Sequence, residues 1–600
     1  MWSRRALAGA ALATLLSCPA SAQIEDSWLE QVDPWGISYL GEDEPALPTR
    51  MWRGARGEDL LALMQEARTK GLSPAEQILM RRLVLSGGRA PEGEEGNALL
   101  AERARIAFEL GEAAAAAGQF AELKAPPPGV DAAAMAADLN LVLGNEATAC
   151  EALNTPNPES EYWPRLRAVC AALAGNTSGA ELAMEMAQAQ GIEDNWLASA
   201  IFAMSGVAPT PPKAKFDSGI GFVMSNRAFL EVTPDAVPAD RADIAAAMAR
   251  RKLTPPDVRV KAAQIAAEAG LIDREAFRIA YNSALAADGF NPRTLLSEAM
   301  FAAADGTSTD ADTTEAIATA LIEAEENPAH FAATASLLRA GMAKLPLGPD
   351  TEDTAFLFAR ANIAAGEFDE AIRWVTPPEP EPEPAAPEPT LEEIGPAPED
   401  ATVSGPANLL VPTGITIETG GPVDDTDAEG PSDTLLAVDE IPLEEEAPVA
   451  EPPTFEAAWV GALVILADAD AGKAAIEAAA DQLIAAAQNE DKAEAAARMF
   501  ALWAAAGTAP PSEARTFLSI YSPVDESSSA PGDAIAIWAA ARSGTAAEVV
   551  LRTVSLTNGD ASELGLADLT LILAALEDIG AEDAARLLAL EATGYWKETP

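Results

Sequence analysis

The stretch from Ala361 to Val375, which reads ANIAAGEFDEAIRWV, decides the fold class that we expect for this chain. An alanine-rich run ends at Gly366, and a second run with spaced apolar residues begins at Phe368. Glycine just beyond a helix often takes the left-handed conformation that ends it, because glycine has no Cβ. The stretch therefore predicts two helices joined by a turn at Gly366, with Phe368 and the small Ala371 following the turn.

The same pattern of an alanine- and leucine-rich run, a glycine and another such run recurs along the chain. Besides Gly366, the glycines in this pattern are Gly118, Gly144, Gly175, Gly270, Gly472, Gly507, Gly544 and Gly580. The last four are spaced 35, 37 and 36 residues apart, which is typical of a solenoid of helical hairpins. Alanine has the best helix propensity, and aromatic residues make up only 5% of the chain. The sequence therefore predicts an all-α fold, an α-solenoid of antiparallel helical hairpins.

Helix starts agree with this prediction. Ser73-Pro74-Ala75-Glu76 offers a capping serine, a proline at the first helical position and a glutamate three residues after the serine. We expect a helix to begin at Pro74, and another to begin in the same style within the segment 254–270.

The residues of the first stretch also carry a resemblance. Gly366-Glu367-Phe368-Asp369-Glu370-Ala371 resembles the turn between the two helices of a tetratricopeptide repeat, and Gly118-Gln119-Phe120 is a weaker echo. The chain as a whole is similar to secreted alanine-rich helical-repeat proteins of Gram-negative bacteria. This resemblance implies an α-solenoid and a location outside the cytoplasm, and it implies no activity.

The first 22 residues have the layout of a secretory signal peptide. Two arginines precede the apolar stretch Ala6–Leu16, and a run of small residues ending in Ala22 offers a cleavage site before Gln23. The apolar stretch is too short to span a membrane. We expect cleavage between Ala22 and Gln23, a mature protein in the periplasm or outside the cell, and no membrane span.

Two variants of this export route stay open. Arg4 and Arg5 partly resemble a twin-arginine signal, which would mean export after folding. Leu15-Leu16-Ser17-Cys18 resembles a lipoprotein cleavage box, which would place a lipid anchor on Cys18. We favour ordinary cleavage over both.

The chain is strongly acidic. Its formal net charge is −55, from 94 acidic and 39 basic residues. Such a surface repels phosphate backbones, so nucleic acid is excluded as the expected partner.

One segment breaks the helical pattern and divides the chain. Residues 377–453 contain 17 prolines and 20 acidic residues without a lysine or arginine, so we expect a long disordered linker. Before it we expect an N-terminal arm at 23–49 and a helical-repeat domain at 50–376, and after it a second helical-repeat domain at 454–600. Within the first of these domains, residues 213–235 are expected to form a loop with at most a short strand pair.

The two cysteines outside the leader are Cys150 and Cys170. A strong turn, NTPNP, lies between the two helical runs that carry them, so an antiparallel hairpin would bring them to a similar height. A zinc site would need two further ligands, and the chain has one histidine. A catalytic thiol would need a basic partner. We therefore expect a disulfide that joins the two helices of a hairpin.

No residue set predicts catalysis, a cofactor or a metal. His330, the sole histidine, follows Asn327-Pro328 and is expected in the first turn of a helix. Gly219-Ile220-Gly221 lacks the third glycine and the strand of a dinucleotide-binding loop. Residues 425–430 resemble the start of a calcium loop, but Leu436 stands where a bidentate glutamate is needed.

These observations favour a non-enzymatic scaffold for protein–protein interaction in the bacterial cell envelope. Stacked hairpins offer an extended face for an envelope protein or peptide. Trp28, Trp35 and Tyr39 lie in the segment before the first helical block. We expect them either to form a docking or capping arm or to pack against the end of the solenoid, and we favour the packing. Two alternatives stay open: a peptidoglycan-directed enzyme or accessory factor carrying an α-solenoid, and an acidic cation-binding surface protein.

Overall fold

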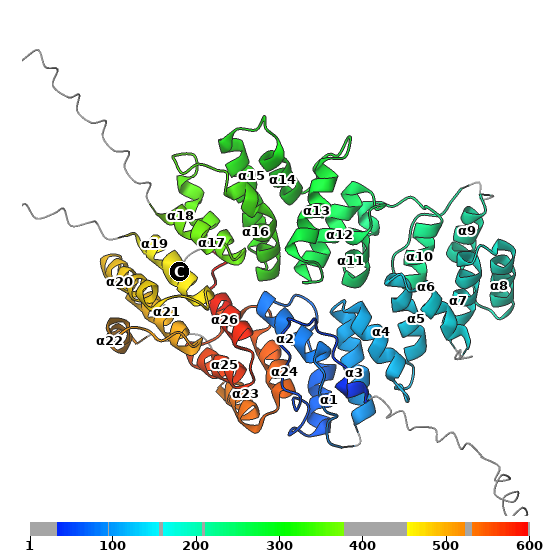
Figure 1. The fold of residues 1–600 in the computed structure, drawn as a ribbon, viewed down its shortest axis with the longest axis horizontal. Helices are drawn as coiled ribbons and strands as arrows, with labels where there is room; N and C mark the ends of the chain where they lie inside the picture. The colour runs from blue at the N-terminus through cyan, green and yellow to red at the C-terminus, as the bar shows by residue number, and fades with distance from the viewer. Residues whose placement is uncertain are drawn as a thin grey trace, which may run out of the picture. The chain divides into compact units, whose positions relative to one another are not determined.

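The computed structural model of this chain describes residues 33–597 except 94, 155–159, 207–209, 377–452 and 523–530. The described residues form 26 α-helices and five short 3₁₀ helices, and contain no strand (Figure 1). The fold is all-α, as the sequence predicts. The predicted signal peptide with its predicted Ala22–Gln23 cleavage site, Cys18, Trp28, nearly all of the predicted linker and residues 425–436 lie outside the described residues.

Eighteen of the helices precede residue 377, and eight follow residue 452. The first group is α1 (Gly57–Gln65), α2 (Pro74–Leu85), α3 (Gly96–Glu109), α4 (Ala113–Glu122), α5 (Ala132–Val142), α6 (Glu146–Glu151), α7 (Tyr162–Leu173), α8 (Thr177–Ala189), α9 (Asn195–Met204), α10 (Gly219–Arg227), α11 (Ala242–Arg250), α12 (Pro256–Glu268), α13 (Arg274–Leu285), α14 (Leu295–Ala304), α15 (Asp310–Ala324), α16 (Pro328–Met342), α17 (Ala355–Ala364) and α18 (Phe368–Val375). The second group is α19 (Phe455–Ala467), α20 (Lys473–Asn489), α21 (Ala493–Ala505), α22 (Ser512–Ile520), α23 (Pro531–Ser543), α24 (Ala546–Thr557), α25 (Leu566–Asp578) and α26 (Glu582–Glu591). The 3₁₀ helices are η1 (Pro34–Gly36), η2 (Ala152–Asn154), η3 (Pro234–Ala236), η4 (Glu352–Thr354) and η5 (Ala561–Glu563).

Most helices that follow one another in the chain pack against each other, as in a helical-repeat solenoid. The joint between α17 and α18 shows how the predicted turn is built. Gly366 has a φ of 72°, its amide donates to the carbonyl of Ile363 at 3.0 Å, and the amide of Glu367 donates to the carbonyl of Asn362 at 2.8 Å. These bonds satisfy carbonyls at the end of α17. Ala371 of α18 is fully buried, so the two helices approach closely at this small side chain.

Two of the predicted helix-ending glycines have other roles. Gly118 lies inside α4, and the turn before α4 is made instead by Gly111, whose φ is 82°. A Cβ at Gly118 would lie 2.5 Å from the Tyr39 hydroxyl, so this glycine makes room for the N-terminal segment. Gly472 has a φ of −72° and is the N-cap of α20, because α19 already ends at Ala467, with Asp468 as its C-cap.

The described part of the N-terminal arm packs on the helices. Trp35 is buried and lies edge-on to Trp52, with ring centroids 5.2 Å apart. The amide of Tyr39 donates to the carbonyl of Leu85 at the end of α2, at 2.8 Å. Trp35 and Tyr39 therefore contact the solenoid itself, the alternative that the sequence favoured for this arm.

The helical blocks on either side of residues 377–452 form one compact unit. α19 packs against α17 and α18, and α24 and α26 pack against α2, so the chain returns to its own N-terminal helices (Figure 1). The predicted capping box is present at the start of α2, where Ser73 and Glu76 exchange side-chain to backbone bonds. We call the contact of α2 with α24, α26 and the residues around Gly559 the seam.

Buried carboxylates hold the seam. Glu76 Oε1 accepts a hydrogen bond from the Gly559 amide at 2.7 Å and another from the Thr557 hydroxyl. Glu591 Oε1 accepts a bond from the Ala75 amide at 2.8 Å. These bonds satisfy amide donors at the first turn of α2 and beyond the end of α24, which would otherwise be buried without partners.

A second set of contacts surrounds these carboxylates. Arg82 of α2 forms a two-pronged ion pair with Asp583 of α26, with one N–O distance of 2.6 Å. Arg68 donates to the side-chain oxygen of Asn558 at 3.0 Å. The seam therefore has a polar lining in addition to the apolar surface that α2 buries.

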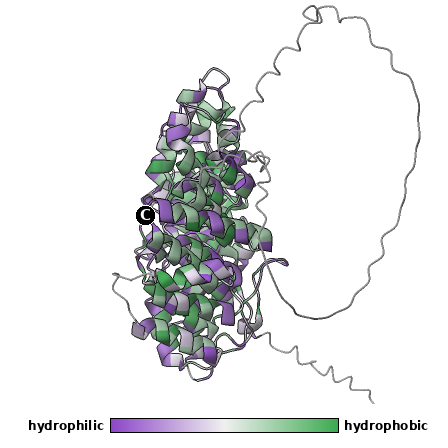
Figure 2. Cartoon of the chain, turned by 90° about the vertical axis from the view of Figure 1, so that its left-hand side faces the viewer, coloured by the Kyte–Doolittle hydropathy of each residue, from purple (hydrophilic) through white to green (hydrophobic). Residues whose placement is uncertain are grey.

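The apolar residues gather into three cores. The main core extends through both helical blocks and contains Trp52, Met80, Phe358, Trp459 and Leu588 among its fully or nearly fully buried members. The second core is formed by α5 to α10, and the third lies around Phe216, Phe222 and Ile244. Single helices carry both hydrophobic and hydrophilic residues along their length, as expected for helices that each cover one side of a core (Figure 2).

In the described part of the chain, no helix has the length and apolar character that crossing a membrane requires.

Candidate functional site

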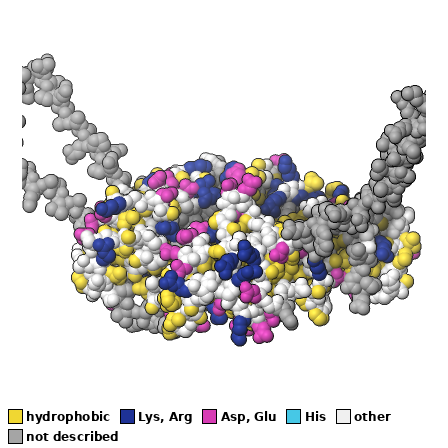
Figure 3. Space-filling model, turned by 60° about the horizontal axis from the view of Figure 1, so that its bottom comes forward, with side chains coloured by type: hydrophobic (Ala, Val, Ile, Leu, Met, Phe, Trp, Pro, Cys, Tyr) yellow, Lys and Arg dark blue, Asp and Glu magenta, His cyan; other side chains and the backbone are white. Residues whose placement is uncertain are grey.

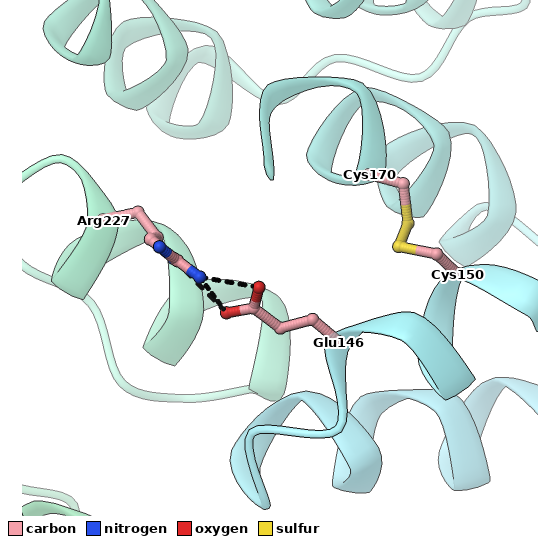
Figure 4. Close-up of a disulfide and its surroundings, with 4 residues drawn as sticks. All are labelled: Glu146, Cys150, Cys170 and Arg227. Atoms are coloured by element: carbon pink, nitrogen blue, oxygen red, sulfur yellow. Dashed lines mark hydrogen bonds and ion pairs between the residues drawn. A yellow bond between two sulfur atoms is a disulfide. The ribbon is translucent and has the colours of Figure 1, made fainter. Parts of the chain in front are cut away.

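The structure joins Cys150 and Cys170 in a disulfide between α6 and α7, with a Cα–Cα distance of 5.8 Å (Figure 4). Next to it, Glu146 of α6 accepts hydrogen bonds from Arg227 of α10 at 2.7 and 2.8 Å. α6 is thus tied covalently to α7 and by an ion pair to α10. These ties hold together three helices that contribute to the second core.

The expectation of a loop over residues 213–235 is wrong in its middle, where α10 forms. The Ser218 hydroxyl accepts from the Gly221 amide at 3.1 Å, which is an ordinary N-cap. Asp138 of α5 adds a second cap, accepting from the amides of Gly219 at 2.7 Å and Ile220 at 3.1 Å. Side chains therefore satisfy three amides of the first turn, and Asp138, which lies more than 80 positions earlier, satisfies two of them.

The two glycines at the start of α10 serve close packing. A Cβ at Gly219 would lie 2.0 Å from the carbonyl oxygen of Asp138, and one at Gly221 would lie 2.8 Å from the carbonyl oxygen of Lys215. Both positions are tighter than any ordinary carbon contact, so only glycine fits. The Gly-Ile-Gly pattern therefore lets α10 approach α5 and the segment before α10.

That segment, residues 213–217, is fixed at several points. The Lys215 amide donates to the Ser225 hydroxyl at 2.8 Å, and the same hydroxyl donates to the Lys215 carbonyl at 3.0 Å. The Trp196 indole donates to the Lys213 carbonyl at 2.8 Å. Ala214 packs against both the second and the third core. The segment therefore lies between the two cores and is held in place by these contacts. We call residues 213–217 the ridge.

Two cavities adjoin this segment. One has a volume of about 430 Å³ and the other about 460 Å³, and four residues line both. The shared residues are Phe108, Lys215, Asp217 and Arg241. We call the two cavities together the α5–α10 groove. The first cavity is further lined by Met135, Asp138, Tyr162, Arg165, Asp194 and Trp196, among others.

Most charged side chains of the groove form ion pairs. Arg165 lies 3.3 Å from Asp194, and Lys215 lies 2.8 Å from Asp217. Arg241 forms a third pair with Asp243 at 2.8 Å and places its guanidinium 5.0 Å from the Phe108 ring centroid. The lining of the two cavities therefore carries both signs of charge, within a chain whose net charge is −55. The lining cations are Arg165, Lys215 and Arg241, and the lining carboxylates are Asp138, Asp194, Asp217 and Asp240.

Two groups in the groove have shifted pKa values. Burial raises the pKa of Asp138, although the Gly219 amide and Arg241 act in the opposite direction. Burial also raises the pKa of Tyr162 well above its usual value, and the neighbouring Asp138 raises it further. The Tyr162 hydroxyl is therefore uncharged at neutral pH and can act as a hydrogen-bond donor.

The other residues singled out by sequence lie elsewhere in the fold. His330 is in the first turn of α16, as predicted, with Nε2 at 3.3 Å from the Gln264 amide nitrogen and 3.8 Å from Glu268 Oε1. Gly366, Phe368 and Ala371 form the α17–α18 joint. Within the described ranges, no three histidine, cysteine, aspartate or glutamate side chains come together as a group that could hold a metal ion.

Sequence reasoning did not find the residues of the groove. Phe108, Asp138, Arg165, Trp196 and Arg241 come from separate helices and caps, and each has an ordinary local context. The one local signal was Gly219-Ile220-Gly221, since a pair of glycines at a helix start indicates a close approach of another segment.

In comparisons with known proteins, no protein-family model matches the chain, and neither a curated protein nor a solved structure matches it. The class of molecule that the structure itself defines is an all-α helical-repeat protein with a charged and aromatic groove.

Proposed function

We propose that this protein is a non-enzymatic scaffold of the bacterial cell envelope that holds a protein or peptide segment in the α5–α10 groove. In build it is similar to tetratricopeptide-like solenoids and to secreted helical-repeat proteins of Gram-negative bacteria. The leader before Gln23 supports export, and the stacked helical hairpins support a binding role.

The observation that carries this proposal is the composition of the groove. Three aromatic side chains, Phe108, Tyr162 and Trp196, line one cavity together with side chains of both charges. Aromatic residues and arginine contribute most to protein recognition, since they combine a large contact area with hydrogen bonding. A groove of this composition suits a polypeptide ligand.

The same geometry gives little support to a catalytic role. Asp138 has the raised pKa that a general acid needs, but its two oxygens accept hydrogen bonds from the first amides of α10. That arrangement supports a capping role for this carboxylate. The mechanism that we propose is therefore surface complementarity, without a chemical step.

The test is site-specific photo-crosslinking in intact cells of the source organism. A photoreactive residue at Trp196 should capture a defined protein, and the same residue at exposed Arg56 should not. Captured proteins are identified by mass spectrometry, with competition by unlabelled protein. Capture of glycan strands, or cell-wall cleavage by purified protein, would contradict the scaffold and favour a peptidoglycan-directed activity.

A further inference from the structure

We propose that the α5–α10 groove binds a short peptide that has both a free ammonium and a free carboxylate, by exchange with the ion pairs Arg165–Asp194 and Lys215–Asp217. The inference rests on the proposed binding function and names the ligand class for that site.

Both ion pairs line the first cavity and are open to exchange. The side chains of Arg165 and Asp194 are 30% and 18% exposed, and those of Lys215 and Asp217 are 49% and 56% exposed. A pair as exposed as Lys215–Asp217 contributes only about 0–1 kcal/mol. The partly exposed Arg165–Asp194 pair is longer, at 3.3 Å. A ligand carboxylate can therefore replace an aspartate at a cation, and a ligand ammonium can replace a cation at an aspartate, at small cost.

Apart from exposed Asp240, which lines the second cavity, the remaining charged groups at the groove are committed to the fold. Arg241 and Asp243 are 13% and 1% exposed, and Arg241 also donates to the Asp217 carbonyl at 3.0 Å. Asp138 accepts from two amides of α10. These groups shape the groove, and the pairs Arg165–Asp194 and Lys215–Asp217 are more accessible to solvent. Asp194 Oδ1 caps α9 by accepting from the Leu197 amide, so its Oδ2, which faces Arg165, is the oxygen that can meet a ligand.

The presence of both cations and carboxylates in the cavity selects the class of ligand. A polyanion would face Asp194 and Asp217 in a chain with a net charge of −55, and an apolar molecule would leave both ion pairs unused. A zwitterion satisfies both signs at once. Its body can lie against Trp196, Phe108 and Met135, and the volume of about 430 Å³ is within the range of small-ligand sites.

The frame around the groove is prearranged. The Cys150–Cys170 disulfide and the Glu146–Arg227 ion pair join α6 to α7 and α10, and Ser225 fixes the ridge that carries Lys215. A fixed frame lowers the cost of ordering the site when a ligand binds.

The test is isothermal titration of the oxidised full-length protein with four tripeptides, Ala-Xaa-Ala, in which Xaa is Phe, Leu, Lys or Glu. Each is used with free ends, N-acetylated, C-amidated and blocked at both ends. At least one free peptide should bind saturably, and blocking either end should weaken binding about tenfold.

Two double variants assign the ends. In Arg165→Gln/Lys215→Gln, amidation of the peptide should no longer matter, while acetylation still weakens binding. In Asp194→Asn/Asp217→Asn, acetylation of the peptide should no longer matter, while amidation still weakens binding. Circular dichroism checks that the variants fold, and Arg56→Gln, which removes an exposed ion pair with Asp59, is the matched control that should bind like the unaltered protein.

The outcomes separate this inference from the proposed function. If the doubly blocked peptide binds as tightly as the free one, or if no peptide binds while Trp196 still crosslinks a protein in cells, the inference is overturned and the scaffold stands. If neither peptide nor protein is captured, both are overturned.

Discussion

Glu591 Oε1 accepts a hydrogen bond of 2.8 Å from the amide of Ala75, which lies 516 residues earlier in the chain. The bond joins the end of α26 to the first turn of α2, in the middle of the seam. It shows that the helices after residue 452 complete the packing of those before residue 377. On the face shown in Figure 3, cationic side chains lie among acidic ones, so both signs of charge occur there as they do in the groove.

The first prediction concerns the pH dependence of stability. Burial, with a smaller contribution from the nearby charges of Glu76 and Asp560, raises the pKa of the Glu591 carboxyl to about 8, although hydrogen bonds from Ser73 and the Ala75 amide act in the opposite direction. At pH values between the ordinary pKa of a glutamate and about 8, the folded protein therefore binds more protons at Glu591 than the unfolded chain does. As a result, the free energy of unfolding falls as the pH rises through that range. Glu591→Gln keeps an acceptor for Ala75 and removes the titration, so its stability should depend less on pH.

Urea unfolding at several pH values between 5 and 9 measures this difference. Glu58→Gln removes an exposed carboxylate and serves as the control. If Glu591→Gln and the unaltered protein lose stability in parallel over this range, the carboxyl of Glu591 is not the group responsible.

The second prediction concerns cleavage between the two helical blocks. A protease site introduced after Asp400 should allow the chain to be cut without separating its parts, because α19 packs on α17 and α18 while α24 and α26 pack on α2. Size-exclusion chromatography of the cut protein should show both fragments in one peak. Glu76→Ala together with Arg82→Ala should weaken the association, since it removes polar contacts across the seam. Separation of the unaltered fragments at micromolar concentration would contradict the seam.

The third prediction concerns the disulfide. Replacing Cys150 and Cys170 with serine should destabilise the region around the groove by about 3 kcal/mol, from the entropy of closing a loop of this length. Hydrogen exchange of the α6 and α7 amides measures the effect, and amides of α14 and α15 serve as an internal control. Dithiothreitol should reproduce the loss in the unaltered protein and leave the double variant unchanged. Equal exchange in the two proteins would mean that the disulfide adds no stability.

The fourth prediction compares two glycines. Gly219→Ala places a Cβ 2.0 Å from the Asp138 carbonyl oxygen, so it should destabilise the protein by about 1–3 kcal/mol through overpacking. Gly472→Ala is the matched control, because its φ is −72° and its Cβ would meet nothing within 4 Å. Thermal unfolding of both variants should show a lower midpoint for Gly219→Ala alone. A similar midpoint for the two would refute the close approach of α5 to α10.

Much of the fold follows from local sequence. The helix that begins at Pro74 with its capping box, the helix start at Asn327 that places His330, and the turn at Gly366 were all predicted. Two of the misplaced expectations share a cause: Gly118 and the 213–235 segment depend on Tyr39 and Asp138, which are far away in sequence.

The sequence by itself determined the all-α class, the helical hairpins and many of the helix ends, because capping bonds and glycine conformations act within about four residues of each other. Only the tertiary structure decided that the two helical blocks close at the seam, and that Arg165, Asp194, Lys215 and Asp217 meet beside Trp196. Contacts of this kind join residues from tens to hundreds of positions apart, and their free energy comes from burial and pairing, which no short stretch of sequence displays.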